Sequence, residues 1–525
     1  MVLCEHLSTS MALVLLALVH AAPSPVARVV SSESGLRLSS QPSVYWRAAA
    51  KCPAGGVEVV HGEPLQEIGG FGASITESSA IVLNALPQVQ QVALLELLYG
   101  RSGARLSAMK ATMLANDEAA QAPWSTYDDT VGDVRLANFS IARDLRPNGS
   151  LTMIKRAQAA GFDGTIQAYM DFPPDWMLVP TRPGLGLPNA TVAPKYYGVL
   201  AAYYARFVEA YAAHGVHIDF LEAFNEPTDS YTQMGPEELA TFLGRHLGPL
   251  FEARGLWPST RLTYGGQCSR TAAAQFIPKI MADARAARYM DVLAYHGYDC
   301  QFEDDGSCDD GRQNYSAIAR LAAAFPSRPL WMTEVCYAYN GDDPNCTSAA
   351  TMRSCTDYPR SPVLAPPLPR TDFADGATWG HRLVAEVASG ASGWIYWNLL
   401  LNTRGGPFLY SPEHADADAN LQHPVIIVDT ERGTYQPTGL FYYLAHFSRY
   451  VRPKARRLTT HMRAPLAGGV SAVAFRGPNS TQPPRTLVQL VNRAAAERTV
   501  PLCSGGHVAD VSLPPSSITT ASFVA

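Results

Sequence analysis

The chain has 525 residues, enough for two or three domains with a large buried core. Hydrophobic residues make up 47% and charged residues 17%, a composition that excludes an intrinsically disordered chain. The formal net charge is −5 and no basic stripe is present, so nucleic acid is excluded as an expected partner.

The N-terminus contains a short apolar run, MALVLLALVHAA, at residues 11–22. Small residues end the run, and it is too short to span a bilayer comfortably. We therefore expect a signal peptide over residues 1–22, with an uncleaved N-terminal anchor as the alternative. Six N-x-[ST] sequons also suit a glycoprotein of the secretory pathway, bound for a lysosome or vacuole or for the cell exterior. They lie at Asn138, Asn148, Asn189, Asn314, Asn345 and Asn479.

The cysteines agree with an oxidising compartment. Of nine cysteines, Cys4 would leave with the signal peptide, so eight remain. Buried free thiols are the alternative to disulfides, because connectivity cannot be read from a sequence. No CxxC pair or histidine cluster has zinc-ligand spacing, and we expect no metal or other cofactor. The pairings we consider are Cys300 with Cys308, Cys346 with Cys355, and Cys52 with Cys503.

The middle of the chain, from about residue 67 to residue 432, alternates short apolar runs with helical patterns such as 196–215 and 236–255. Strand, helix and strand at this spacing indicate parallel βαβ units, and six or more of them predict a (β/α)8 TIM barrel. An open doubly wound sheet is the alternative, but no GxGxxG follows a first strand. The strand-like runs are GTIQAYM (164–170), HIDFLEAF (217–224), RLTYGG (261–266), MDVLAYHGY (290–298), PLWMTEV (329–335) and SGWIYWNLL (392–400).

Both ends of the chain have a different pattern. After a helix in FYYLAHFSRYV, the tail contains short strands with turn signals, which is typical of a β-sandwich. Strand-like pieces such as SVYWRA and VEVVHG also precede the barrel. We therefore expect an α/β fold with a TIM barrel over residues 66–438 and an appended β-sandwich built from residues 28–65 and 439–525.

Two glutamates end apolar runs of the predicted barrel, which is where catalytic residues of this fold lie. Glu226 follows FLEAFN and Glu334 follows PLWMT, a separation of about three βα units. A lone glutamate after a strand is more often a solvated loop residue, but two of them can face each other across a barrel mouth. Glycoside hydrolysis requires such a pair. Aromatic residues near strand ends would stack on sugar faces: Trp176, Tyr231, His296, Tyr298, Trp394 and Trp397.

The segment from EIGGFGASITESSA (67–80) to YYLAHFSRYV (442–451) resembles glycoside hydrolase family 30 and, within it, the lysosomal glucosylceramidases. FNEP resembles the acid/base motif of the family, and TEVC (333–336) resembles its nucleophile motif. GWIYWNLLLNTRGGP (393–407) and PVIIVDTERGTY (424–435) resemble its later barrel segments. Family members are retaining enzymes, so the resemblance implies Glu226 as acid/base and Glu334 as nucleophile.

The resemblance also implies a sugar subsite. Asp117, Trp176 and Trp397 match sugar-binding residues, and Asn225 should bond the 2-hydroxyl. The remaining neighbours are Tyr231 and Tyr298, which would bond or screen the nucleophile, and His296, which would lie beside the site or act as a core histidine.

Several residues depart from the family pattern. Lys110 stands where the family has an arginine near the nucleophile, and lysine supplies a point charge without the bidentate fork. Asp171 replaces an aromatic residue, and Phe408 with the loop 409–422 alters the mouth. These changes leave the β-glycosidase class intact and bear on which aglycone is accepted.

We therefore expect a retaining β-glycosidase without cofactor, a glucosylceramidase-like enzyme of sphingolipid metabolism. A glycolipid substrate would bring it into peripheral contact with membrane lipid. The alternatives are a secreted hydrolase of a cell-wall or matrix oligosaccharide, such as a β-1,6-galactan or a β-xyloside, and a carbohydrate-binding protein impaired by the Lys110 change. Like-charge repulsion from Glu334 is expected to keep Glu226 protonated at rest.

Overall fold

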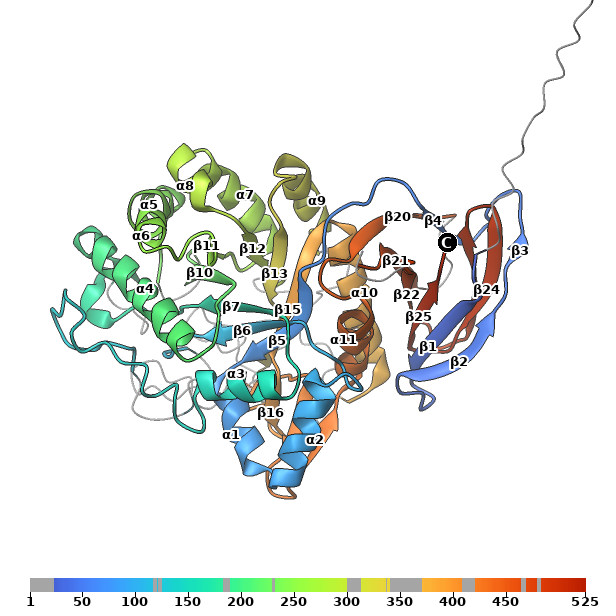
Figure 1. The fold of residues 1–525 in the computed structure, drawn as a ribbon, viewed down its shortest axis with the longest axis horizontal. Coiled ribbons are helices and arrows are strands. Elements are labelled where there is room, and N and C mark those ends of the chain that lie inside the picture. The colour runs from blue at the N-terminus through green and yellow to red at the C-terminus, as the bar shows by residue number, and fades with distance from the viewer. Residues whose placement is uncertain are drawn as a thin grey trace, which may run out of the picture.

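The fold has two parts, an eight-stranded barrel and a separate β-sheet domain. Helices α10 (Phe373–Ala388) and α11 (Gly439–Tyr450) lie between them (Figure 1). The computed structural model describes residues 23–116, 120, 125–182, 189–228, 232–299, 313–336, 338–339, 371–407, 421–463, 469–478 and 483–525. The predicted fold class is confirmed: a TIM barrel with an appended β domain that takes strands from both ends of the chain.

The barrel consists of eight parallel strands that follow one another around the ring in chain order. Isolated bridges from Leu262 to Met290 and from Gln267 to Tyr295 bring the last two edges together. Each strand-like run of the sequence overlaps one of these strands. They are β5 (Gly70–Ile75), β6 (Ala108–Thr112), β7 (Thr165–Tyr169), β10 (Phe220–Asn225), β11 (Arg261–Gly266), β12 (Leu293–His296), β13 (Leu330–Glu334) and β15 (Ala391–Asn398).

Helices cover the outside of the barrel, and several begin at a side-chain cap. Thr76, Ser269 and Thr438 each accept a backbone N–H from the first turn of the helix that follows. Besides α10 and α11, the helices are α1 (Glu77–Ala85), α2 (Gln88–Tyr99), α3 (Ser150–Ala159), α4 (Tyr197–Ala213), α5 (Pro236–Phe242), α6 (Gly248–Ala253), α7 (Arg270–Met281), α8 (Ala284–Tyr289) and α9 (Tyr315–Ala324).

The helical pattern at 236–255 differs from the expected single helix. A π-helical turn at Leu243–Leu247 separates α5 from α6. Pro249 is the second residue of α6, and a proline in a continuing helix has no N–H to donate to the preceding turn. The wider turn is a physically reasonable response to that missing donor.

Short strands complete the barrel side. A hairpin of β8 and β9 follows β7, and a small sheet of β16, β18 and β19 follows β15. The predicted strand at 392–400 is therefore divided, because β16 leaves the barrel to pair with β18. These elements are β8 (Leu178–Arg182), β9 (Asn189–Val192), β14 (Ala338–Tyr339), β16 (Leu400–Asn402), β17 (Leu421–Gln422), β18 (Ile426–Asp429) and β19 (Thr434–Pro437).

The β domain joins strands from both termini in one order, β2-β1-β25-β22-β21-β20-β4-β23-β24-β3. Residues Arg456–Leu458 of β20 pair with β21, and Thr459–Met462 of the same strand pair with β4. This strand therefore passes from one sheet to the other around a separate apolar core. The strands are β1 (Val26–Ser32), β2 (Ser39–Val44), β3 (Arg47–Ala48), β4 (Val57–Val60), β20 (Arg456–Met462), β21 (Val470–Arg476), β22 (Thr486–Asn492), β23 (Arg498–Ser504), β24 (His507–Leu513) and β25 (Ser517–Phe523).

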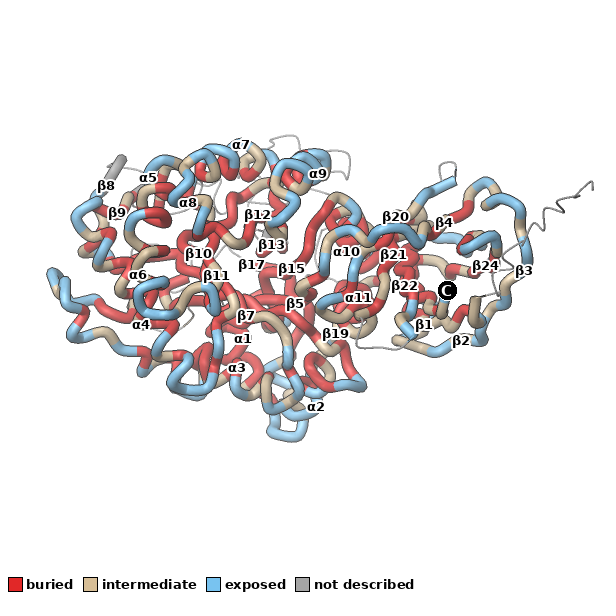
Figure 2. Tube along the Cα trace, turned by 45° about the horizontal axis from the view of Figure 1, so that its top comes forward, coloured by how far each residue is buried: buried red, intermediate tan, exposed pale blue. Residues whose placement is uncertain are grey.

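One of the predicted disulfides is confirmed. Cys52 and Cys503 are bonded and join segments 451 residues apart in the sequence. Cys268 and Cys336 are buried thiols, and the other two predicted pairs lie outside the described residues. Buried residues follow the barrel strands and the interior of the β domain (Figure 2). Within the described ranges, no helix is both long and apolar enough to cross a membrane.

A buried carboxylate anchors the long segment after β6 to helix α4. Asp144 is fully buried and its Oδ2 accepts the hydroxyls of Tyr127, at 2.5 Å, and Tyr211, at 2.8 Å. Burial, with a contribution from the charge of Glu77, raises the pKa of Asp144 to about 7, against the opposing hydrogen bonds of the two tyrosines. The folded protein therefore binds this proton more tightly than the unfolded chain.

We expect the free energy of unfolding to depend on pH through this residue. Because the pKa of Asp144 is raised in the folded protein, the stability that this residue contributes is fully present below about pH 4 and is lost as pH rises towards 7. Asp144→Asn removes this titration, so its stability relative to the wild type should rise by about 2–3 kcal/mol between pH 5 and pH 8. Urea unfolding at the two pH values measures it, with Asp510→Asn on exposed β24 as the control. An equal stability difference at both pH values would contradict the prediction.

Candidate active site

The interior of the barrel has an apolar floor and a polar upper layer. Ala108, Phe220, Val292, Trp331 and Ile395 form a buried cluster across the floor. The ring of Trp331 fits there because Gly393 has no side chain: a Cβ would lie 2.2 Å from a ring carbon. Side chains two positions apart share a strand face. Lys110, Glu222 and Trp397 each stand two residues after a floor residue, so they belong to the layer towards the strand ends.

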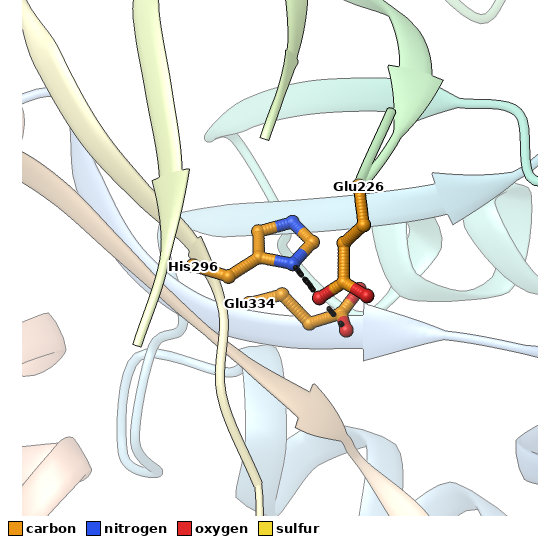
Figure 3. A group of neighbouring side chains, drawn as sticks. All are labelled: Glu226, His296 and Glu334. Atoms are coloured by element: carbon orange, nitrogen blue, oxygen red, sulfur yellow. Dashed lines mark hydrogen bonds and ion pairs between the residues drawn. The ribbon is translucent and has the colours of Figure 1, made fainter. Parts of the chain in front are cut away.

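The two predicted glutamates meet above this layer. Glu334 is the last residue of β13 and Glu226 directly follows β10, three strands away around the barrel, as the sequence predicted. Their side chains point toward each other, with the His296 ring beside them (Figure 3). One carboxylate oxygen from each glutamate and one nitrogen of His296 lie within 4.8 Å of one another.

The backbone at Glu226 has an unusual conformation. Its φ is +41°, in the left-handed region that a residue with a long side chain seldom adopts. Such a residue costs on the order of 1–3 kcal/mol, and the surroundings must hold it in place. Here the N–H of Glu226 donates to Gly266 O at 2.9 Å, and the N–H of Asn225 donates to Met170 O at 3.0 Å. This conformation aims the carboxyl group across the mouth.

Lys110 supplies positive charge to Glu334. Its Nζ lies 2.7 Å from Glu334 Oε2 and 3.8 Å from the centre of the Tyr169 ring, and the side chain is fully buried. Burial alone would lower the pKa of Lys110, but the charges of Glu334 and Glu222 outweigh it and raise that pKa. Lys110 contacts a single oxygen, and Tyr298 Oη donates to Glu334 Oε1 at 3.2 Å. The point-charge geometry predicted for lysine is therefore observed.

His296 bonds the other glutamate. Its Nδ1 lies 2.7 Å from Glu226 Oε1 and 3.7 Å from Glu334 Oε1, and the ring is completely buried. Burial disfavours the imidazolium, but the carboxylates of Glu334, Glu222 and Glu226 outweigh burial and raise the pKa of His296 to about 9. Repulsion from Glu334 is expected to keep Glu226 protonated, and the structure adds a second influence on that proton, the hydrogen bond between Glu226 and His296 Nδ1.

Glu222 is the main site residue that sequence reasoning missed. It lies in β10, is fully buried, and accepts Gly266 N–H at 2.6 Å and the side-chain amide of Gln167. Burial opposes its ionisation, but the charges of Lys110 and His296 prevail and lower the pKa of Glu222. The signal was present in the sequence, since a glutamate inside an apolar strand is almost never buried without partners.

Other predicted residues have different outcomes. Trp397 packs against Tyr169, and the ammonium group of Lys110 lies over its ring. Asn225 is the last residue of β10, directly before Glu226. Trp176 is half-buried, donates to Asp128 O at 2.9 Å and packs on Tyr196, and its role in sugar binding stays a prediction. Asp117, Tyr231, Asn345 and Asn479 lie outside the described residues. Of the other sequons, Asn138 is exposed, and the side chain of Asn314 caps α9.

Trp394 does not belong to the mouth. It is buried on the outer face of β15, against Trp379 of α10. Alternation along the strand explains this, because Ile395 and Trp397 face the interior and Trp394 must face outward. The aromatic platform predicted from the sequence is therefore smaller than expected.

Two carboxylates and an imidazole are also ligands that divalent metals accept. In this site, however, the same side chains already have protein partners of suitable charge: Lys110 pairs with Glu334, and His296 Nδ1 bonds Glu226. A cation placed among them would have to compete with the buried ammonium group. The arrangement therefore fits two carboxyl groups acting on a bond between them better than it fits a metal centre.

Comparisons with known proteins bear on this geometry. The model of the glycosyl hydrolase family 30 TIM-barrel domain matches residues 68–343 and 370–451. The chain is 26% identical over 398 residues to an endo-1,6-β-D-glucanase of Neurospora crassa, covering 74% of this chain and 71% of that protein. It is 23% identical over 449 residues to the lysosomal acid glucosylceramidase of Mus musculus, covering 83% of this chain and 76% of that protein.

Solved structures share the fold. SrfJ of Salmonella typhimurium superposes with a TM-score of 0.77 at 21% identity, covering 95% of this chain and 99% of that chain. An endo-β1,6-glucanase superposes with a TM-score of 0.73 at 20% identity, with the same coverage of 95% and 99%. At this identity the superpositions establish the common architecture of barrel and β domain.

Proposed function

The chain belongs to glycoside hydrolase family 30, and on that premise we propose that it is a retaining β-glycosidase with Glu334 as nucleophile and Glu226 as acid/base. The observation that carries the proposal is the closeness of the two carboxyl groups, whose nearest oxygens lie within 4.8 Å. Retaining enzymes place the two groups about 5–5.5 Å apart, whereas inverting enzymes need roughly 6.5–9.5 Å to admit a water.

The proposed reaction is a double displacement. Glu334 attacks the anomeric carbon, Glu226 protonates the departing oxygen, and a covalent glycosyl-enzyme forms. Glu226 then takes a proton from water, which attacks the same carbon and releases the sugar. The contacts of Lys110 and Tyr298 leave Glu334 oriented and charge-compensated for the attack. Because Glu334 keeps a cationic partner, we do not favour a binding protein without catalysis.

The same geometry supports a sugar-reading role for Asn225. Its Oδ1 is buried and has no hydrogen-bond partner among the described residues. A buried amide oxygen without a donor is costly, so a hydroxyl of the bound sugar would satisfy it. We propose that this contact is made to the 2-hydroxyl, where it would strengthen as the transition state forms.

The substrate class we propose is a β-glucoside. Relatives named as endo-1,6-β-glucanase and as glucosylceramidase both match most of the chain, so two aglycones follow: a second glucose in a β-1,6-glucan, or the ceramide of a glycolipid. A lipid aglycone would imply peripheral contact with a membrane surface. We further propose passage through the secretory pathway, on the basis of the N-terminal apolar run and the sequons.

Stereochemistry and a substrate panel test the proposal together. Proton NMR of the first product released from an aryl β-glucoside should show the β-anomer before mutarotation. Glucosylceramide in detergent and β-1,6-glucan oligosaccharides, assayed in parallel, distinguish the aglycones, and β-1,6-galactan and xylan oligosaccharides serve as sugar controls. Initial release of the α-anomer would overturn the mechanism, and cleavage of galactan or xylan alone would overturn the β-glucoside assignment.

A further inference from the structure

Glu222 lies below the catalytic pair, and the double displacement gives it no role. It is enclosed in the barrel with no exposed surface. An ionised carboxylate in such a place costs several kcal/mol unless positive charge and hydrogen bonds compensate it. The hydrogen bonds come from Gly266 and Gln167, and the positive charge comes from Lys110 and His296.

The ring of His296 connects this buried carboxylate to the mouth. Its Nε2 lies 3.7 Å from Glu222 Oε1, and its Nδ1 lies 2.7 Å from Glu226 Oε1. The 3.7 Å distance between Nε2 and Glu222 Oε1 is too long for a hydrogen bond, so Glu222 acts on the ring through its charge. A negative charge at that distance stabilises the imidazolium over the neutral ring.

Other titratable groups also face His296. Glu226 follows β10, Glu334 ends β13, Lys110 lies on β6 and Tyr298 follows β12. Lys110 opposes the imidazolium, and the carboxylates favour it. Glu222 differs from the two mouth carboxylates because it does not take part in bond making, so its charge is constant through the catalytic cycle.

The Glu226–His296 hydrogen bond can hold one proton in two ways. Either the imidazolium donates to the carboxylate, or the protonated carboxyl group donates to the neutral ring. The proton count is identical, and the proton moves only along the bond between Nδ1 and Oε1. The second form is the one that can protonate a leaving oxygen.

We propose that Glu222 is a positioning residue that acts through His296 to keep the catalytic proton on the Glu226–His296 pair at neutral and alkaline pH. The proposal rests on the proposed function. In the first half-reaction the bond from C1 to the leaving oxygen breaks, the bond from C1 to Glu334 forms, and the pair gives its proton to the leaving oxygen. In the second half-reaction water supplies hydroxide to C1, the bond to Glu334 breaks, and the proton of that water returns to the pair.

Removing the charge of Glu222 should therefore lower the pKa of His296. Neighbouring charges shift a pKa by about 1–3 units, and we expect Glu222→Gln to lower that of His296 by at least about one unit. The alkaline limb of kcat/KM should move to lower pH by a similar amount. The amide can keep both hydrogen bonds, because Gln167 can turn its own amide, whose Oε1 has no partner among the described residues.

The experiment has an NMR readout and a kinetic readout. With histidines labelled at Cε1, the His296 resonance is identified by its loss in His296→Asn and is titrated in the wild type and in Glu222→Gln. Asp219→Asn is the matched control. This carboxylate directly precedes β10, at the end of the strand away from Glu226, and accepts the N–H of Ile166 on β7. It should leave both the titration and the alkaline limb unchanged. Glu222→Asp, which withdraws the charge by one methylene, should give a smaller shift in the same direction.

A double-mutant cycle tests whether Glu222 acts through His296. In a His296→Asn background, Glu222→Gln should not move the alkaline limb further. An unchanged His296 titration in Glu222→Gln, or an equal kinetic shift without His296, would overturn the inference. If Glu222→Gln does not fold, the Glu222→Asp titration decides in the same way. The titration needs no turnover, so a chain that cleaves no glycoside would defeat the proposed function and leave this result readable.

Discussion

Glu334→Gln should abolish hydrolysis of β-glucosides, lowering kcat by roughly 10⁴-fold or more, because an amide cannot form the covalent intermediate. The loss should be similar for substrates with good and poor leaving groups, since the same bond must form in each. Initial rates with a dinitrophenyl β-glucoside and an alkyl β-glucoside measure it. Glu209→Gln, on the exposed side of α4, is the control for the loss of one carboxylate.

The same substitution leaves the buried ammonium group of Lys110 without its nearest counter-charge. Removing one partner of a buried ion pair costs about 3–5 kcal/mol, here partly offset by Glu222 and Asp171. The double variant Lys110→Met with Glu334→Gln should recover much of this stability and none of the activity. Thermal unfolding of the two variants separates the chemical role of Glu334 from its structural one. Substantial turnover by a folded Glu334→Gln protein would contradict the assignment.

The glutamate pair could be predicted from the sequence because each member ends an apolar run. In a barrel, the ends of such runs meet at one face whatever the details of packing. Topology and spacing therefore predicted the strands at whose ends Glu226 and Glu334 lie. Lys110 was placed near Glu334 by the family resemblance and not by topology, and its ammonium group contacts one oxygen of that carboxylate.

The direction of side chains inside the barrel was harder to predict. Parallel barrel strands are buried on both faces, so SGWIYWNLL has no alternation of polar and apolar residues to mark the inner face. Trp394 was assigned to the mouth for this reason, although it packs against α10. Glu222 was missed because a sequence does not reveal that Gly266 and Gln167, from two other strands, satisfy its carboxylate.

The electrostatic arrangement also depends on contacts between distant segments. The pKa of His296 is raised by carboxylates carried by β10 and β13. The distances from its ring nitrogens to these carboxylates are set by the curvature of the closed barrel. Chain separation does not define these distances. The raised pKa of His296 between Glu226 and Glu334 therefore depends on the folded arrangement. The amino-acid sequence supports only the weaker expectation of repulsion between the two glutamates.

Glu226→Ala should make the rate strongly dependent on the leaving group. General acid catalysis contributes about 10²–10⁴-fold, so kcat/KM for an alkyl β-glucoside should fall by that range. A dinitrophenyl group leaves without protonation, and kcat/KM for that glucoside should change little. Hydrolysis of the covalent intermediate still needs a base, so kcat should fall and a burst of dinitrophenol should precede a slow steady state.

Azide provides the decisive comparison for this variant. A small anion that attacks without a general base should enter the space left by the missing side chain and restore the steady-state rate, forming a β-glucosyl azide. Glu226→Gln keeps the side-chain volume and a group that can bond His296, so azide should restore much less activity there. If azide instead produced an α-glucosyl azide in Glu226→Ala, Glu226 would be the nucleophile, since azide in the place of a missing nucleophile attacks the face opposite the leaving group and inverts the configuration once.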